Sequence, residues 1–316
     1  MINLSPYLKI IRIPNLLIII LTQYLLRICV IQIFYSLGDV VPAVNHFDFA
    51  LLVFSTLLIA AGGNVINDYF DEAVDKINKP DKILIGKSIS RTSAYIYYWV
   101  LTIPGIIIGF YLAIKVDYLQ LGFVYVAIAI MLWFYSERYQ RKVLWGNLIV
   151  SALSAMVILI VWLFEFFALK ANPFEYVETI KYLKPVSLIV IVYAVFAFFT
   201  SIIREIFKDI EDMEGDKSAG YRTLAIVAGL KLSKLTGLGL ILILMTLIGV
   251  SQYFLWQEGF NLVFWYLLIA VQTLLLFVIY NALKSKTKED YHFLSNAMKI
   301  IMVAGILSME LFYASI

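Results

Sequence analysis

The sequence predicts an all-α polytopic membrane protein with nine transmembrane helices, and three observations carry that prediction. Apolar residues make up 62% of the 316-residue chain, and the mean hydropathy is +0.89, whereas a soluble domain is closer to half apolar. Apolar runs of the length that crosses a bilayer as a helix, about 20 residues, recur along the chain. Lysine and arginine gather in every second connection between these runs. A soluble globular fold is therefore excluded by composition.

Each predicted span is an apolar run bounded by short polar segments. In chain order, the runs are 14–35, 48–66, 94–114, 118–135, 144–168, 186–203, 235–256, 262–283 and 294–315. The first follows Lys9 and Arg12, as in a signal peptide, but it is too long for an h-region and lacks a small-residue cleavage site, so we expect it to be retained. No Pro/Gly/Ser-rich linker separates the runs, so residues 1–316 are expected to form a single membrane-embedded domain. The lone Cys29 excludes an intrachain disulfide.

The distribution of positive charge predicts the orientation of the chain. The N-terminal arm and the even-numbered connections hold nineteen Lys and Arg residues, and the odd-numbered connections hold four. This bias indicates a cytoplasmic N-terminus and, with nine spans, a C-terminus outside. We expect an integral protein of a bacterial or archaeal cell membrane, with membrane lipids around it. The net charge of only +3 gives no indication of a nucleic-acid partner.

Two short acidic stretches stand out against this apolar background. Residues 68–75 read DYFDEAVD and residues 209–216 read DIEDMEGD, and each stretch has aspartate at positions one, four and eight. These aspartates are Asp68, Asp71 and Asp75, then Asp209, Asp212 and Asp216. On a helix these offsets fall within about 60° of arc, so each set is expected to share one face. Asn64 and Asn67 extend the first face by a turn, while Gly215 is a possible helix break in the second set.

Three carboxylates on one face repel one another and are costly to desolvate near a membrane, so each set calls for a cation. Oxygen ligands without a nearby His or Cys suit Mg²⁺, which usually takes one or two protein carboxylates and leaves positions for phosphate oxygens. The sequence therefore predicts two or more Mg²⁺ ions that clamp a diphosphate. The expected ligands are Asn67, Asp71 and Asp75 for one ion, and Asp209, Asp212 and Asp216 for another, with Asp68 close by. The alternative for either set is a solvated, acid-rich helix end, which the repeated spacing disfavours.

The aspartate stretches resemble the signatures of a known enzyme family. The pattern Asn67-Asp68-x-x-Asp71-x-x-x-Asp75 resembles the first motif of the UbiA superfamily of intramembrane prenyltransferases. The stretch 209–216 resembles its second aspartate motif, and GDKSAGYRTLAI (215–226) is similar to the segment that follows it. Nine helices with both motifs on cytoplasmic connections match the family's architecture. The resemblance implies transfer of a prenyl group from a polyprenyl diphosphate donor to an acceptor, with Mg²⁺ required.

Two longer segments look most like the glycerol-ether branch of this superfamily. They are GGNVINDYFDEAVDKINKPDK (62–82) and REIFKDIEDMEGDKSAG (204–220). Enzymes of that branch alkylate a hydroxyl of a prenyl-glycerol phosphate, so the resemblance implies a lipid-like acceptor such as geranylgeranylglyceryl phosphate. An aromatic acid, the precursor of a quinone, is the alternative acceptor. The segment KPDKILIGKSIS (79–90) departs from the family by lacking the second proline of its basic turn.

The six aspartates are assigned the catalytic role of stabilising the diphosphate leaving group through the metals. The residues expected to bind substrate are Arg12, Asn64, Asn67, Lys79, Tyr135, Tyr139, Lys142 and Arg222. Lys79, Lys142 and Arg222 are candidates for the diphosphate, and Arg12 for a phosphate of donor or acceptor. Tyr135 and Tyr139 could line the prenyl path and shield the allylic cation with their ring faces. For each basic residue, a role in topology alone is the alternative.

Two other membrane activities use acidic residues. An ion-coupled transporter would hold its acids near the midplane, on helices interrupted by Gly or Pro. In this sequence the acids lie at the predicted cytoplasmic edge. A phosphotransferase that joins alcohols to nucleotide-activated lipids also uses paired aspartates and Mg²⁺, but the Asp-Gly and Ala-Arg pairs of its motif are absent. Both activities remain remoter alternatives to prenyl transfer.

Overall fold

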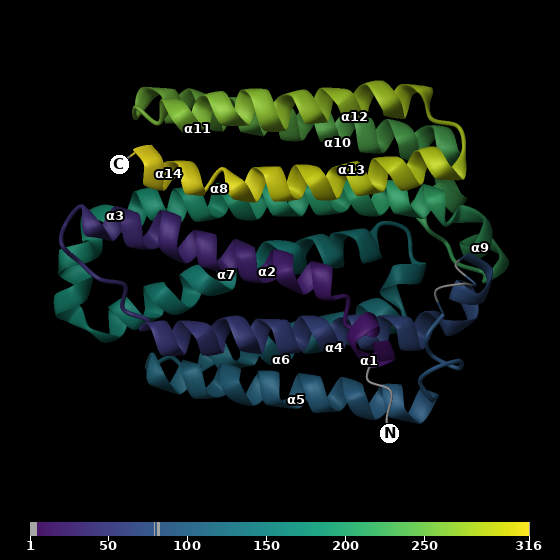
Figure 1. Cartoon of the computed structure of the whole chain (residues 1–316), viewed down its shortest axis with the longest axis horizontal. Helices are drawn as coiled ribbons and strands as arrows, with labels where there is room; N and C mark the ends of the chain where they lie inside the picture. Colours follow the sequence, from purple (N-terminus) through teal and green to yellow (C-terminus); the bar gives the residue numbers. More distant parts are fainter. Residues whose placement is uncertain (1–4, 79, 81–82, 316) are drawn as a thin grey trace.

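The computed structural model describes residues 5–78, 80 and 83–315, and its long helices run along the longest axis of the molecule (Figure 1). Nine helical segments of this part of the chain are long and apolar enough to cross a membrane, which confirms the predicted number. The same residues form no β-strand, only two isolated bridges. The prediction of an all-α polytopic membrane protein is therefore correct.

Five of the spans are single helices, one is kinked and three are composite. The single helices are α4 (His46–Asn78), α5 (Arg91–Lys115), α6 (Gln120–Glu137), α7 (Trp145–Ala171) and α8 (Pro173–Glu211). Helix α10 (Leu224–Gln257) is kinked at Gly229, which has non-helical φ and ψ of 78° and 166°. The first span joins α2 (Ile13–Leu25), the π-helix η1 (Leu26–Gln32) and α3 (Ile33–Ser36). The eighth joins α11 (Asn261–Tyr266), the π-helix η4 (Leu267–Gln272) and α12 (Thr273–Lys284), and the ninth joins α13 (Lys288–Leu307) and α14 (Glu310–Ser315). Short helices of the described residues outside the spans include α1 (Ser5–Ile10), the 3₁₀-helix η3 (Tyr139–Arg141) and α9 (Met213–Ser218).

Helices α4 and α8 are longer than the apolar runs that predict them. With 33 and 39 residues, they reach about 50 and 60 Å at 1.5 Å per residue, whereas the hydrocarbon core of a bilayer is about 30 Å thick. The segment after the second apolar run contains no Gly or Pro through Asn78, so α4 continues through the whole first aspartate set. The prediction that these three aspartates lie on one continuous helix is correct.

The second aspartate set lies on two helices, which differs from the expectation for Gly215. Helix α8 ends at Glu211, Asp212 has non-helical φ and ψ of −90° and 4°, and α9 begins at Met213. Gly215 lies inside α9. The break therefore comes three residues earlier than Gly215, at an aspartate, a residue type whose side chain competes with the helical backbone for hydrogen bonds.

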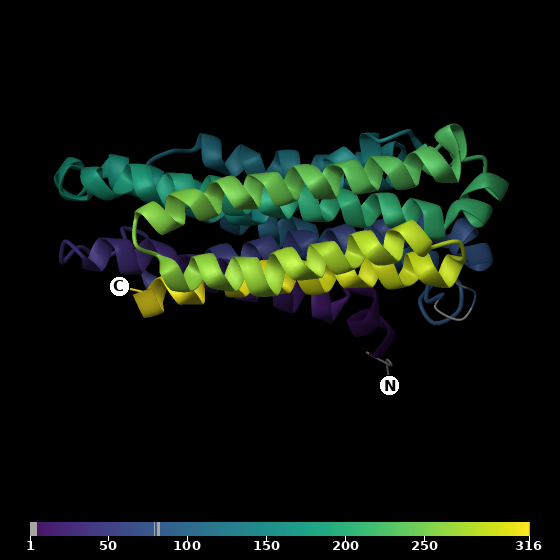
Figure 2. The same ribbon diagram turned by 90° about the horizontal axis from the view of Figure 1, so that it is seen from above.

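Helix α8 packs against α7, α10 and α13, while α4 packs against α5 and α6 (Figures 1 and 2). Short α1 is held against α4 and α5: Ile10 is buried with Val65 and Ala94, and the rings of Tyr7 and Tyr97 meet edge to face at 5.2 Å. In Figure 1, α9 and the end of α4 lie at the right, and the C-terminus lies at the left. The two aspartate segments are thus at the opposite end of the bundle from the C-terminus.

A buried ion pair lies far from the aspartates along the bundle. Arg27, in η1, donates from Nη1 to Oε2 of Glu165 on α7 at 2.8 Å, and both side chains are almost fully buried. The backbone N–H groups of Ala43 and Val44 also donate to the Glu165 carboxylate, at 2.7 and 3.2 Å. The carbonyl of Val44 accepts from the Arg27 guanidinium. This network ties the connection after α3 to α7.

Candidate active site

The two aspartate segments meet where the end of α4 packs against α9 (Figure 1). The side-chain amide of Asn78, the last residue of α4, donates to Oδ1 of Asp216 at 3.4 Å. Gly215 makes the approach possible, because a Cβ there would lie 1.9 Å from Oδ1 of Asn78. The fold therefore brings together two sequence segments that the spacing pattern identifies separately.

In the first set, Asp68 is paired with Arg12. The Arg12 Nη2 atom lies 2.6 Å from Oδ1 of Asp68. Arg12 has a left-handed backbone, with φ of 55° and ψ of 60°, which is uncommon outside glycine and tends to mark functional positions. The side-chain amide of Asn64 donates to the carbonyl of Ile11 at 2.9 Å, so it supports the turn that presents Arg12. Although partial desolvation lowers the pKa of Arg12, whose side chain is 45% exposed, the carboxylates of Asp68 and Asp75 raise this pKa above its ordinary value.

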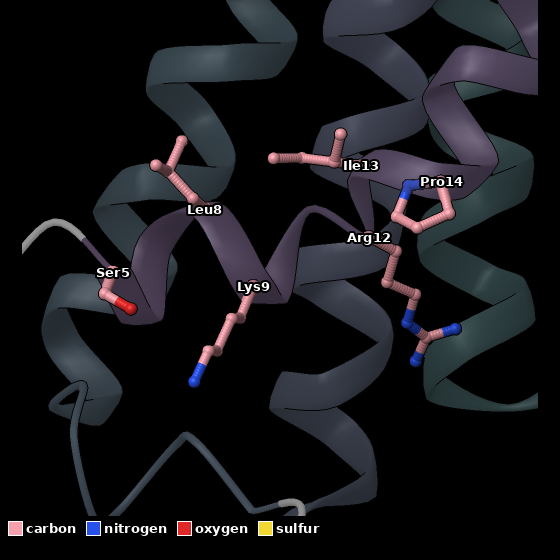
Figure 3. Close-up of a pocket in the computed structure, with 6 residues that line it drawn as sticks. All are labelled: Ser5, Leu8, Lys9, Arg12, Ile13 and Pro14. Carbon is pink, nitrogen blue, oxygen red and sulfur yellow. The ribbon is translucent and has the colours of Figure 1, made fainter.

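Arg12 also borders a surface cavity of about 480 Å³ between α1 and the start of α2. In Figure 3 the side chains of Lys9 and Arg12 extend toward the same side of this segment. The residues that line the cavity are Ser5, Leu8, Lys9, Arg12, Ile13 and Pro14. The cavity combines apolar walls with two cations, which is the character of a surface that meets lipid headgroups.

Asp71 is buried and has one oxygen held and one free. Its Oδ2 accepts from the amides of Asn67 at 2.8 Å and Gln140 at 2.7 Å. Its Oδ1 is buried and has no hydrogen-bond partner in the described part of the chain. Gln140 comes from η3, which lies close to the start of α7 because Gly146 has no side chain: a Cβ there would be 2.8 Å from the Gln140 Cα. A buried carboxylate oxygen without a hydrogen-bond partner calls for an explanation, and a bound cation would supply the missing partner.

The second set is held in a similar way. Oδ2 of Asp209 accepts from the amide of Asn147 on α7 at 2.9 Å. Oδ2 of Asp212 lies 3.4 Å from Nζ of Lys208, one turn earlier on α8. Asp212 and Asp216 are both buried. Tyr135, near the end of α6, interacts electrostatically with carboxylates of both sets, Asp71 and Asp209. This tyrosine, predicted to contact substrate, therefore lies near carboxylates of both sets.

The predicted diphosphate contacts Lys142 and Arg222 are neighbours. Residues 142 and 222 form an isolated parallel bridge, in which the N–H of Arg222 donates to the carbonyl of Arg141 at 2.9 Å. Lys142 Nζ lies 5.3 Å from the centroid of the Tyr139 ring. Tyr139, the second tyrosine predicted to contact substrate, therefore makes a cation–π contact with Lys142. Lys79, the third predicted diphosphate contact, lies outside the described residues.

Tyr221 connects this bridge to the aspartates. Its ring lies 5.1 Å from the Arg141 guanidinium, and its N–H donates to the carbonyl of Asp216 at 2.9 Å. Burial and the neighbouring carboxylates of Asp71 and Asp216 raise the pKa of Tyr221 to about 12. The phenol therefore stays protonated at neutral pH and can donate a hydrogen bond to an anion.

The aspartate site fits divalent ions whose coordination shell is completed by oxygens of the substrate. Among the described residues, no group of three or more His, Cys, Asp or Glu side chains is arranged to hold a metal by itself. Mg²⁺ does not need such a cage, because it usually takes one or two protein carboxylates and fills its remaining positions with waters and phosphate oxygens. The free Oδ1 of Asp71, the hard oxygen donors around it and the paired segments all agree with this mode of binding.

Several residues of the site escape sequence reasoning. They are the amides Asn78, Gln140 and Asn147, and the phenol Tyr221. Asn78 carries a weak signal, since it follows Asp75 by three residues and so continues the helix face. The others have no signal of their own, because single amides at the ends of membrane spans are common and only their contacts mark them.

Comparisons with known proteins agree with the geometry. The UbiA prenyltransferase family matches residues 25–302 of the chain. A digeranylgeranylglyceryl phosphate synthase of Methanosphaera stadtmanae is 28% identical over 305 residues, which cover 96% of this chain and 98% of the relative. A solved structure of digeranylgeranylglyceryl phosphate synthase aligns with a TM-score of 0.61 and 26% identity, covering 98% of this chain and 99% of the other. A homologue from Archaeoglobus fulgidus bound to GPP and Mg²⁺ shares the fold, with a TM-score of 0.52, 15% identity and coverage of 96% and 99%.

Proposed function

The chain belongs to the UbiA prenyltransferase family, and from this premise we propose that it transfers a prenyl group from a polyprenyl diphosphate to geranylgeranylglyceryl phosphate. It is an integral membrane enzyme with a divalent-metal requirement. The meeting of the two aspartate segments at Asn78 and Asp216 is the observation that carries the proposal. The likeness to digeranylgeranylglyceryl phosphate synthases over nearly the whole chain supports the choice of acceptor.

Two or more Mg²⁺ ions are proposed to be held by the two sets. Asn67, Asp71 and Asp75 hold one ion, and the second set of ligands consists of Asp209, Asp212 and Asp216. Bound Mg²⁺ offsets the charge of the diphosphate and makes it a better leaving group. The amide of Gln140 donates to one oxygen of Asp71, and the amide of Asn147 donates to one oxygen of Asp209. These hydrogen bonds orient the two carboxylates and leave the other oxygen of each available for a metal ion.

Cationic and phenolic groups complete the site. Lys142 and Arg222 are proposed to contact the diphosphate from the bridged connections, together with Lys79. The protonated phenol of Tyr221 donates to an anionic oxygen. Arg12 neutralises Asp68 and can reach a phosphate at the membrane surface. Each of these groups attracts the diphosphate oxygens more strongly as the leaving group gains charge, so they favour bond breaking over substrate binding alone.

The transfer step exchanges one C–O bond for another. The bond between the allylic carbon and the diphosphate breaks, the acceptor hydroxyl oxygen forms a bond to that carbon, and the hydroxyl proton passes to the released diphosphate. Tyr135, which lies near carboxylates of both sets, is proposed to present its aromatic ring to the reacting carbon, because ring faces stabilise positive charge. Tyr139 supports Lys142. Asn64 acts on substrate through the turn that presents Arg12.

The chain is proposed to form one domain, residues 1–316, in a cell membrane with the N-terminus in the cytoplasm and the C-terminus outside. The charge bias of nineteen against four supports this orientation. The arrangement of the bundle agrees with it, because the aspartate segments and the C-terminus lie at opposite ends (Figure 1). The diphosphate headgroup of the amphipathic donor would then reach the site from the cytoplasmic side of the membrane.

A competition experiment tests the proposed function. Purified protein in proteoliposomes receives labelled geranylgeranyl diphosphate together with geranylgeranylglyceryl phosphate and a hydroxylated aromatic acid. We expect label in the glycerol-ether product, identified by mass. Label only in the aromatic product would replace the acceptor while retaining prenyl transfer. Solute movement without any consumption of diphosphate would favour an ion-coupled transporter instead.

A further inference from the structure

Cations from three helical segments gather beside the aspartate site. Lys299, on α13, interacts electrostatically with Arg204 and Lys208 of α8 and with Arg12 at the start of α2. Glu205 is the carboxylate in this group. Helix α13 packs against both α8 and α2, so the grouping follows from the packing of the bundle. We call these residues, Arg12, Arg204, Lys208 and Lys299, the cationic cluster.

Three members of the cationic cluster have carboxylate partners. Arg12 is paired with Asp68 at 2.6 Å and Lys208 with Asp212 at 3.4 Å. Arg204 is bound to Glu205, although its Nε atom is buried and has no hydrogen-bond partner in the part of the chain that the structure describes. Lys299 forms no ion pair with any residue of the ranges 5–78, 80 and 83–315. One positive charge of the cluster is therefore left over.

Lys299 lies too far inside its membrane span to serve only as a positive charge that sets the orientation of the chain. It lies eleven residues into the span Lys288–Ser315, about 16 Å from the start of that helix, and its neighbours Met298 and Ile301 are buried. Lysine within a membrane span is costly and typically faces the interior of the bundle, where it marks the path of a ligand or ion. Its interactions with α8 and α2 agree with an inward direction.

We propose that Lys299, with Arg204 beside it, binds the phosphate of the acceptor lipid. This assignment rests on the proposed function and deepens it. A phosphate monoester carries between one and two negative charges near pH 7, which matches one unpaired ammonium and one guanidinium with a free N–H. Because the aspartates and their ions bind the diphosphate of the donor, the ammonium of Lys299 remains available for the other anionic group of the reaction, the phosphate of the acceptor.

The spacing along α8 agrees with two separate phosphate sites. Arg204 precedes Asp212 by eight residues, about 12 Å along the helix. An acceptor phosphate held by Lys299 and Arg204 would lie deeper in the bundle than the diphosphate, with the glycerol unit between them. The acceptor hydroxyl would then face the allylic carbon. Lysine, a compact point charge, suits a terminal phosphate that can approach from several directions.

Steady-state kinetics in proteoliposomes test the assignment. Lys299→Met keeps the length of the side chain and removes its charge, Lys299→Arg keeps the charge, and Lys231→Met is the matched control on an exposed lysine of α10. We expect Lys299→Met to raise the KM for geranylgeranylglyceryl phosphate by about 10- to 100-fold, as loss of a charged hydrogen bond does. The donor KM should be unchanged, and Lys299→Arg should recover most of the loss. Thermal unfolding of each purified variant checks that it is folded.

A phosphate-free acceptor separates recognition of the phosphate from general damage. Geranylgeranylglycerol should be a poor substrate for the wild type and an equally poor one for Lys299→Met. An unchanged acceptor KM, a loss of the same size with geranylgeranylglycerol, or a rise in the donor KM alone would each overturn the assignment of Lys299. A wild-type protein that consumes the donor without forming a glycerol-ether product would instead overturn the proposed acceptor, and with it this inference.

Discussion

The amide of Asn78 and the carboxylate of Asp216 meet at 3.4 Å and join two segments that are 138 residues apart. Between them lies Gly215, at which a Cβ would come within 1.9 Å of the Asn78 side chain. The two halves of the aspartate site are therefore held in register by an amide and by the absence of a side chain. Four predictions test this arrangement and the rest of the molecule.

Gly215→Ala should lower kcat/KM by about tenfold or more, because overpacking at a tight contact displaces the groups around it. Gly239→Ala is the matched control, since a Cβ there meets nothing within 4 Å. Asn78→Ala removes the atoms with which the new methyl collides. In the double variant, Gly215→Ala should therefore add little to the effect of Asn78→Ala. Fully additive losses in a double-mutant cycle would show that the contact does not set the register.

Asp71→Asn and Asp212→Asn should each reduce turnover by about 100-fold or more, as loss of a group that stabilises transition-state charge does. Both replacements keep the size of the side chain, so the protein should remain folded. Glu214→Gln is the control, because Glu214 is an exposed acid in the same segment. Product formation should also stop in EDTA and return with Mg²⁺. Full activity of both asparagine variants, or full activity in EDTA, would contradict the metal site.

Glu165→Gln should destabilise the protein by about 3 kcal/mol or more, because it leaves the buried Arg27 guanidinium without its counter-charge. The measurement is thermal unfolding in detergent, with exposed Glu258→Gln expected to stay within about 0.5 kcal/mol of the wild type. The folded fraction of Glu165→Gln should keep the wild-type KM for both substrates, since Glu165 lies toward the opposite end of α7 from Asn147. A changed KM without loss of stability would assign this pair to substrate binding instead.

Reporter fusions should give opposite results at two positions near the end of the chain. A reporter at the C-terminus is expected outside the cytoplasm, and one inserted next to Lys286 is expected inside, because the charge bias predicts this orientation. A single predicted membrane span, Lys288–Ser315, separates the two positions. Alkaline phosphatase and green fluorescent protein activities distinguish the two sides. Equal results at both positions would mean that this last helix does not cross the membrane.

The amino-acid sequence by itself determined the number of spans and the place of the aspartates within them. Hydropathy is a local property of 20-residue windows, and nothing elsewhere in the chain changes it, so all nine spans appear where the apolar runs predict them. The first aspartate set also follows from local pattern, because the segment from Asn67 to Asn78 contains no Gly or Pro. Helix geometry alone then fixes which side chains share a face.

Only the tertiary structure decided how these pieces meet. The partners Gln140 and Asn147 and the grouping of Lys299 with Arg204 all depend on contacts between distant segments. Periodicity tells which way a side chain points on its own helix, but not which helix it faces. Those pairings are chosen by the packing of whole helices against one another, and the energies of single polar contacts are too small and too context-dependent to reveal them from sequence.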